Sequence, residues 1–163
     1  MISFGVFALE NRVVVVGGGH AGVEAACALS RLGKRCILLS LDKSSIGRLS
    51  CNPAVGGVAK SHLVKEIDAL GGVMGWASDA AAIQFKMLNK TKGRAVWSLR
   101  AQLDKKTYPA IIQKHIADKH PLITIIEDEA VNLKIKKASV VGVVTRKGRQ
   151  ISCNGVVITC GTF

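Results

Sequence analysis

Cys51 is the side chain of this sequence that is best placed to act as a nucleophile. It lies in residues 42–57, DKSSIGRLSCNPAVGG, whose Gly, Ser, Asn and Pro content predicts a loop. A loop of sixteen residues is long for a compact domain, and such loops are often functional. Arg48 and Lys60 flank the cysteine in sequence, and positive charge near a thiol favours the nucleophilic thiolate. The segment therefore predicts a reactive cysteine in an open loop.

A glycine-rich turn is the second feature with a chemical use. The β-branched run Arg12–Val16 leads directly into GGGHAG, which opens an alanine-rich segment. The first glycine permits a tight turn, the third lets a diphosphate approach the backbone, and the last lets the helix pack closely on the strand. Free N–H groups at the start of that helix attract an anion. The residues predicted to hold a dinucleotide diphosphate are Gly17, Gly18, Gly19, His20, Ala21 and Gly22.

The elements around this turn predict one βαβ unit. The helix ends at Gly33 and a second apolar run follows at Cys36–Leu39, so the whole unit takes about thirty residues. Many such units end the second strand with an acidic residue that binds the ribose. Here that position is Ser40, and Asp42 is the alternative.

The composition fits one α/β domain with a substantial core, because 48% of the 163 residues are hydrophobic and 17 are glycine. No apolar run approaches the ~20 residues of a membrane span. The opening residues MISFGVFAL lack the basic segment and the cleavage site of a signal peptide. We therefore expect a cytoplasmic protein of bacterial type, not an organellar or membrane protein.

The five cysteines do not predict a disulfide framework or a zinc site, because their number is odd and no pair has ligand spacing. Apart from Cys51, they fall in predicted helices or strands or near a strand end. Cys27, Cys36, Cys153 and Cys160 are therefore expected to be small buried hydrophobic side chains.

The charge balance is strongly basic, with 23 Lys and Arg against 11 Asp and Glu, a formal +12. Attraction to a polyanion such as nucleic acid and a merely solvated basic surface both explain it. Basic residues from Lys86 to Arg100 surround Trp97, a pattern that can bind nucleic acid or phosphate. A positively charged face without a ligand explains that pattern equally well.

The remaining patterns predict two more helices and several strands. Helices are expected at 57–70 and 102–119, short strands or turns at 73–93, a strand at 122–126, a three-stranded meander at 131–135, 140–145 and 150–153, and a buried parallel strand at 155–159. The chain then stops at TCGTF, a turn with the character of a cofactor contact, so we expect it to be the N-terminal piece of a longer protein. The meander resembles the crossover of FAD domains, and an ordinary NAD domain with helical crossovers is the alternative.

Several separated motifs resemble the MnmG/GidA family. They are GGGHAGVEAA, IGRLSCNPAVGGVAKSHLVKEIDALGG, IQFKMLNKTKGRAVWSLRAQ and the closing TCGTF, and together they cover about residues 12–163. The family usually reads IGKGHL where this chain has VAKSHL, so the glycine lost at Ala59 is expected to tighten the backbone. The glycine lost at Ser61 is expected to have the same effect. The family usually reads KGPAV where this chain has KGRAV, which replaces a proline by Arg94.

The resemblance implies a truncated Rossmann-like FAD-binding domain, a parallel sheet with helices and a three-stranded meander. Residues 1–163 would be the N-terminal part of that domain, without the family's NAD(P)H-binding insertion and helical C-terminal domain. The implied activity is FAD-dependent addition of a (carboxymethyl)aminomethyl group to C5 of the tRNA wobble uridine. NADH would be the reductant, methylene-tetrahydrofolate the one-carbon donor and the GTPase MnmE the partner, in a homodimer that forms a heterotetramer.

The resemblance also implies roles for individual residues. Cys51 matches the family's catalytic SCNP cysteine, either as the nucleophile that adds to uridine C6 or in acid–base work. Val131 falls where the backbone meets the adenine, and Gly161 and Thr162 would approach the flavin. The alternatives are a generic FAD- and NADH-dependent thiol or small-molecule oxidoreductase and a non-enzymatic, basic nucleotide-binding module.

Overall fold

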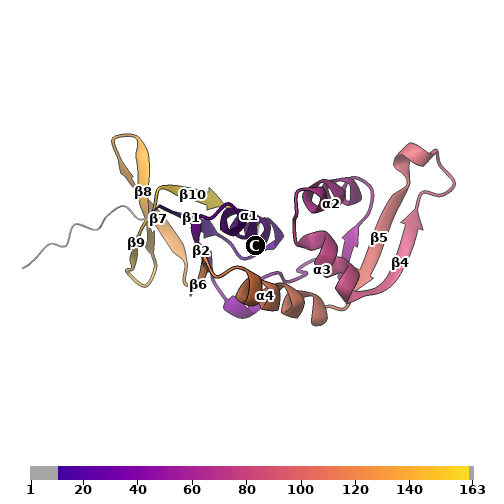
Figure 1. Cartoon of the computed structure of the whole chain (residues 1–163), viewed down its shortest axis with the longest axis horizontal. Coiled ribbons are helices and arrows are strands. Elements are labelled where there is room, and N and C mark those ends of the chain that lie inside the picture. Colours follow the sequence, from indigo (N-terminus) through magenta and orange to yellow (C-terminus); the bar gives the residue numbers. More distant parts are fainter. Residues whose placement is uncertain (1–10, 162–163) are drawn as a thin grey trace, which may run out of the picture.

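A four-stranded parallel sheet forms the centre of the molecule. The computed structural model describes residues 11–161 and leaves 1–10 and 162–163 outside the described residues. The strands, in spatial order, are β10 (Gly155–Ile158), β1 (Arg12–Val16), β2 (Arg35–Ser40) and β6 (Ile123–Glu127). Helix α1 (His20–Arg31) joins β1 to β2, so the predicted βαβ unit is confirmed (Figure 1).

Two antiparallel sheets lie at opposite ends of the molecule (Figure 1). One is the predicted meander of β7 (Ala130–Lys136), β8 (Ser139–Thr145) and β9 (Gln150–Ser152). The other has the order β3 (Ala54–Gly56), β5 (Ser98–Leu103) and β4 (Ala82–Leu88). Helices α2 (Lys60–Ala69), α3 (Met74–Ala81) and α4 (Thr107–Lys119) and two short turns, η1 (Lys43–Ser45) and η2 (Arg94–Val96), complete the fold.

Both faces of the central strands β1 and β2 are covered, as their apolar runs predict. Strand β10 was expected to be buried, but as an edge strand it is partly exposed, and Ile158 is 64% exposed. Successive side chains of β1 point to opposite faces, and Val14 and Val15 accordingly belong to two different core clusters. Val14 packs with the meander residues Val143 and Ile151. Val15 packs in the larger cluster with the side chains of α1, α3 and α4. The α/β class expected from the sequence is therefore the observed one.

Glu24 on α1 links this sheet to the second half of the molecule. Its carboxylate accepts hydrogen bonds from the backbone N–H groups of Val73, at 2.9 and 3.1 Å, and Met74, at 2.6 Å, where α3 begins. The first N–H groups of a helix have no partner within the helix, and no side chain of Val73 itself caps this one. A residue fifty positions away therefore caps α3.

The sequence patterns are wrong in three places. Residues 73–93 were expected as short strands or turns. Strand β4 confirms this for Ala82–Leu88, but Met74–Ala81 form α3, whose start is capped by Glu24. Residues 102 and 103 were expected in a helix, but they end β5, and Asp104 starts α4 by accepting hydrogen bonds from the Lys106 and Thr107 N–H groups. The helix expected at 57–70 begins only at Lys60.

The apolar positions of α2 also differ from expectation. Leu63 is 57% exposed and Leu70 is 82% exposed, whereas Ser61 is the buried residue of this helix. Ser61 Oγ lies 2.8 Å from Ser98 Oγ of β5, so a buried hydroxyl pair holds the helix against the sheet. None of the helices within residues 11–161 combines the length and apolar character needed to cross a bilayer.

Ala59 occupies a strained backbone conformation just before α2. Its φ of 63° and ψ of −54°, with a 2.7 Å hydrogen bond from Lys60 N–H to the Val58 carbonyl, describe the rare positive-φ γ-turn. A non-glycine residue in such a region costs about 1–3 kcal/mol. The backbone at Ala59 is therefore strained in this chain.

Replacing Ala59 with glycine should relieve this strain. Relief of the strain should contribute about 1–3 kcal/mol to the free energy of unfolding. The extra conformational entropy that glycine loses on folding costs only about 0.5–1 kcal/mol. We expect Ala59→Gly to raise the free energy of unfolding in denaturant titrations. Ala69→Gly, at the end of α2 in ordinary helical conformation, is the matched control and should lower it. If both variants lowered the free energy of unfolding by the same amount, strain at Ala59 would be contradicted.

Candidate functional site

A groove of about 710 Å³ runs along the carboxyl edge of the parallel sheet. Each of the four strands contributes the residues that follow its last position, which is where α/β sheets bind ligands. We call it the dinucleotide groove. Its lining comprises Val16, Gly17, Gly18, Gly19, His20, Ala21, Leu39, Ser40, Leu41, Asp42, Ser45, Arg48, Ser50, Asp128, Glu129, Ala130, Thr159, Cys160 and Gly161.

The glycine turn has the geometry that its sequence predicts. Gly17 has φ +112°, a conformation that side-chain-bearing residues rarely adopt. A Cβ on Gly22 would lie 1.8 Å from the Gly17 carbonyl oxygen, so only glycine lets α1 pack this closely on β1. At Gly19, in contrast, a Cβ would meet nothing within 4 Å. Gly19 therefore leaves open space in the groove, as a bound diphosphate requires.

The start of α1 supplies hydrogen-bond donors to that space. The helix has no side-chain cap at Gly19 and no acidic residue in its first turn. The first intrahelical bond runs from Val23 N–H to the Gly19 carbonyl, so the N–H groups before Val23 have no partner within the helix. With the helix dipole behind them, these N–H groups favour an anion in the groove.

The acidic residues around the groove are engaged with the protein itself. Asp42 accepts hydrogen bonds from the Ser44 backbone N–H and hydroxyl, both at 2.7 Å, and these bonds lower the pKa of its carboxyl. Asp128 accepts one from the Glu129 N–H at 2.8 Å, and Glu129 forms a salt bridge with Arg146. Ser40, at the usual ribose position, is 5% exposed and donates to the Asp42 carbonyl at 3.0 Å.

The remaining predicted contacts fall at or near the groove. Gly161 lines it, whereas Thr162 lies outside the described residues. Val131 is not part of the lining; the preceding Ala130 is, and the Val131 side chain is 48% exposed. Cys160 was expected to be buried, but it is exposed and lines the groove, because β10 ends before it at Ile158.

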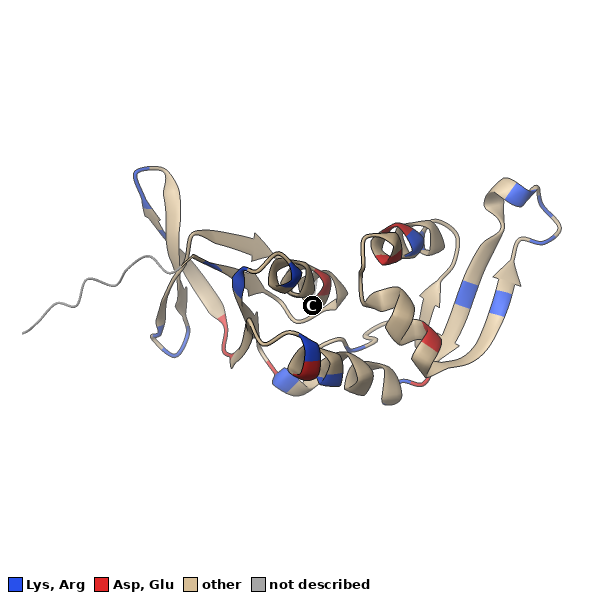
Figure 2. Ribbon diagram, in the orientation of Figure 1, with Lys and Arg blue, Asp and Glu red and all other residues tan. Residues whose placement is uncertain are grey.

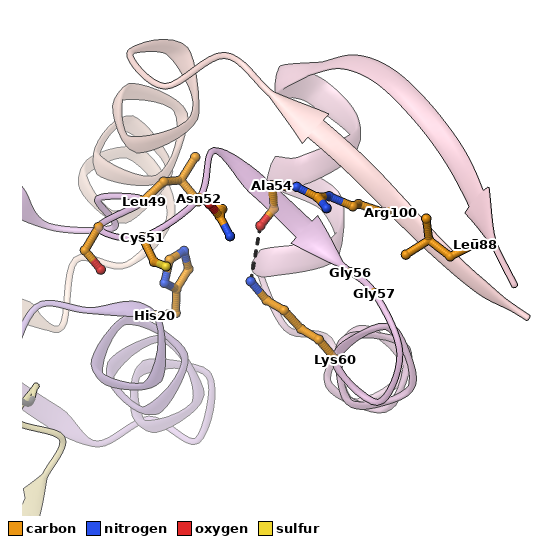
Figure 3. Close-up of a pocket in the computed structure, with 11 residues that line it drawn as sticks. His20, Leu49, Cys51, Asn52, Ala54, Gly56, Gly57, Lys60, Leu88 and Arg100 are labelled. Atoms are coloured by element: carbon orange, nitrogen blue, oxygen red, sulfur yellow. Dashed lines mark hydrogen bonds between the residues drawn. The ribbon is translucent and has the colours of Figure 1, made fainter. Parts of the chain in front are cut away.

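Cys51 lies in a second, smaller cavity of about 320 Å³ (Figure 3). We call it the Cys51 pocket. Its lining comprises His20, Leu49, Ser50, Cys51, Asn52, Ala54, Gly56, Gly57, Lys60, Leu88 and Arg100. His20 and Ser50 line both this pocket and the dinucleotide groove, so the two cavities adjoin. The exposed loop position predicted for Cys51 is confirmed.

Two cations lie in the Cys51 pocket. The Lys60 Nζ donates a 3.3 Å hydrogen bond to the Ala54 carbonyl, which turns the ammonium inward (Figure 3). Burial lowers the pKa of Lys60 and the charge of Arg100 lowers it further, while Cys51 acts in the opposite direction and favours the ammonium. Arg48, the other predicted neighbour of Cys51, lines the dinucleotide groove instead.

His20 stands between the two cavities as a neutral side chain. Burial, and then the charge of Lys60, lower the pKa of its imidazole to about 4. Its ring centroid lies 5.6 Å from that of buried Tyr108. Among the described residues its buried Nε2 has no hydrogen-bond partner. A neutral, unpartnered imidazole nitrogen in this position can form a hydrogen bond with a ligand, as acceptor or donor according to the tautomer.

Sequence reasoning found Cys51 and Lys60 but missed the part that His20 and Arg100 play beside them. His20 was assigned only to the diphosphate turn, and Arg100 only to a basic surface. They lie 31 residues before and 49 residues after Cys51 in the sequence, so no local spacing indicates the contact. The antiparallel pairing of Arg100 with Gly56 brings it there.

Comparison with known proteins identifies the family. The family model described as glucose inhibited division protein A matches residues 12–163. The chain belongs to this family. A GidA relative of Aquifex aeolicus, curated as the tRNA uridine 5-carboxymethylaminomethyl modification enzyme MnmG, is 50% identical over 154 residues, which are 94% of this chain and 25% of that protein.

Two further matches agree. The MnmG of Protochlamydia amoebophila is 46% identical over 157 residues, which are 96% of this chain and 25% of the relative. A crystal structure of Aquifex aeolicus GidA superposes with a TM-score of 0.89 at 47% identity, covering 97% of this chain and 26% of that one. The chain thus spans about a quarter of the length of the GidA relatives it matches.

The lowered pKa of His20 predicts a pH-dependent stability. The unfolded chain binds a proton at His20 near pH 6.5, but the folded chain binds it only near pH 4. The unfolded state therefore holds more protons between these values, and stability is lost as the pH falls through them. His20→Gln should flatten the profile by up to about 3 kcal/mol between pH 6.5 and pH 4. The free energies of unfolding of wild type and variant are measured by denaturant titration at each pH. If both fell equally between pH 6.5 and pH 4, the prediction would be contradicted.

Proposed function

We propose that this chain is the N-terminal part of the FAD-binding domain of an enzyme that modifies C5 of the tRNA wobble uridine. The observation that carries the proposal is the contact between the two cavities. The dinucleotide groove and the Cys51 pocket share His20 and Ser50, so a redox cofactor and a nucleophile would meet at one place. The MnmG relatives, named as tRNA uridine 5-carboxymethylaminomethyl modification enzymes, support the substrate.

The groove fits FAD by its geometry. The open space at Gly19 and the unpartnered N–H groups of α1 suit a diphosphate, and the carboxyl ends of β2 and β6 leave room for the adenosine half. In this proposal Ser40 and the backbone near Ala130 and Val131 contact that half, and Gly161 and Thr162 approach the flavin. FAD, when bound, supplies the redox steps, with NADH as its reductant.

The Cys51 pocket fits the chemistry at uridine C5. When a thiolate adds to C6, a sulfur–carbon bond forms and the electrons of the C5–C6 double bond move toward C5 and the O4 carbonyl, which makes C5 nucleophilic. The ammonium of Lys60 would balance the negative charge of the thiolate or of the adduct. A role of Cys51 in acid–base work is the alternative. Methylene-tetrahydrofolate would supply the carbon that C5 attacks.

The proposal extends to partners that this chain does not contain. The rest of the family's architecture, an NAD(P)H-binding insertion and a helical C-terminal domain, would complete the enzyme. We propose tRNA as the substrate, the GTPase MnmE as the partner, a homodimer that joins it in a heterotetramer, and the bacterial cytoplasm as the location.

The cofactor assignment is tested by two glycine substitutions with opposite expected effects. Gly19→Val places its side chain in the open groove and leaves the helix contact intact, so we expect normal unfolding without FAD but at least tenfold weaker FAD binding. Gly22→Ala would clash with the Gly17 carbonyl and should prevent normal folding. Flavin absorbance titration and circular dichroism measure the two effects. Unchanged FAD affinity in Gly19→Val would refute the site.

The activity is tested with Cys51→Ser in the complete gene product. Wobble nucleosides of tRNA are measured by mass spectrometry from cells that lack the gene and cells that carry the wild type or the variant. We expect the modified wobble uridine to disappear without the gene, to return with the wild type and to stay absent with Cys51→Ser, while FAD binding is retained. Full modification with Cys51→Ser would exclude the proposed role of this thiol.

A further inference from the structure

The β4–β5 hairpin is a basic arm that projects from the Cys51 pocket. Residues 82–103 contain five basic side chains and no acidic one. Figure 2 shows the basic residues on both strands and around the tip, at the end of the molecule opposite the meander. The five basic residues are Lys86, Lys90, Lys92, Arg94 and Arg100.

The strand register places two of these cations in one row with the pocket. Arg100 pairs with Gly56 on one side and with Lys86 on the other. Residues directly opposite in antiparallel strands point to the same face of a sheet, so Lys86 and Arg100 project from the face to which Gly56 belongs. Gly56 and Arg100 both line the Cys51 pocket. The row therefore begins inside the pocket and ends at the outer strand.

The two faces of the hairpin differ in character. The residues adjacent to Lys86 and Arg100 along each strand point to the other face of the sheet. Three of these neighbours are apolar: Phe85, Leu99 and Ala101. Like charges placed directly opposite each other, as Lys86 and Arg100 are, destabilise a sheet slightly. Their placement on the pocket side is therefore not explained by the stability of the hairpin.

The cations of the arm have no acidic partner in the part of the chain that the structure describes. The ion pair seen there, between Arg146 and Glu129, lies on the meander side of the molecule. Lys86, Lys90 and Lys92 are all exposed. These exposed cations therefore form a positively charged surface that leads to the Cys51 pocket. Such a surface attracts a polyanion.

Trp97 adds a flat surface at the tip of the arm. Its side chain is 39% exposed, and its Nε1 donates a 3.0 Å hydrogen bond to the Lys92 carbonyl, which holds the ring in place. The Arg94 guanidinium lies 5.8 Å from the ring centroid. Aromatic rings among basic residues bind single-stranded nucleic acid by stacking with its bases.

We propose that this arm is the docking surface for the phosphate backbone of the RNA substrate. The row of Lys86 and Arg100 guides the strand toward Lys60 and Cys51 in the pocket, and the tip around Trp97 holds the more distant nucleotides. The inference rests on the proposed function, because the occupant of the row must carry the group that reacts at Cys51. Charge complementarity and the direction of the row select a polyanionic strand that enters the pocket.

The test compares two triple substitutions with the same change in charge. Lys86→Gln, Lys90→Gln and Lys92→Gln remove three of the five positive charges of the arm without altering the lining of the Cys51 pocket. Lys134→Gln, Lys136→Gln and Lys137→Gln neutralise three exposed lysines of the meander, at the far end of the molecule (Figure 1). The complete gene product with FAD bound is titrated with a tRNA transcript that carries a wobble uridine, over a range of salt concentrations.

The arm variant should bind tRNA at least tenfold more weakly. The slope of the logarithm of affinity against the logarithm of salt should fall by about 2, since each lost phosphate contact on a single strand contributes about 0.7. The modification rate at saturating tRNA should persist, with a raised KM. The meander variant should match the wild type.

The outcomes separate this inference from the function on which it rests. Wild-type protein that neither binds nor modifies tRNA would overturn both. Wild-type protein that modifies tRNA, with arm and meander variants of equal affinity, would overturn the docking surface alone. An arm variant that keeps its tRNA affinity but loses binding to the GTPase would assign the arm to an acidic protein partner and also overturn the inference.

Discussion

The close contact between Gly22 and the Gly17 carbonyl is the constraint on which the rest of the structure depends. A Cβ at this point would lie 1.8 Å from the oxygen, so α1 can pack on β1 only with glycine here. The contact fixes where α1 begins relative to the sheet edge. It therefore directs the unpartnered N–H groups of the first turn into the groove, and it sets His20 at the junction of the two cavities.

The second half of the molecule is positioned by polar contacts as well as by the apolar core that it shares with the parallel sheet. Glu24 reaches from α1 to cap α3, and the hydroxyls of Ser61 and Ser98 join α2 to the antiparallel sheet. Charge-assisted hydrogen bonds to a helix start are specific in direction as well as favourable in energy. These contacts set the orientation of the sheet that carries Arg100 and of the helix that carries Lys60, and so they shape the pocket around Cys51.

One strained backbone position lies next to this pocket. Ala59 adopts a positive-φ γ-turn, and the following residue is Lys60, whose ammonium turns back to the Ala54 carbonyl. The family motif usually has glycine at the position of Ala59. In this chain the structure holds an alanine in that strained turn. Strain at such a position fits a role in orienting the side chain that follows it.

The sequence by itself determined the βαβ unit at Arg12–Ser40, the meander and the parallel strand before Thr159, because glycine turns and β-branched runs act over neighbouring residues. It also indicated that Cys51 lies in an exposed loop. Only the tertiary structure decided that α3 is a helix, since its cap comes from Glu24. Only it placed His20 and Arg100 beside Cys51, because these contacts depend on how α1 packs and on strand register, and neither leaves a local pattern in the sequence.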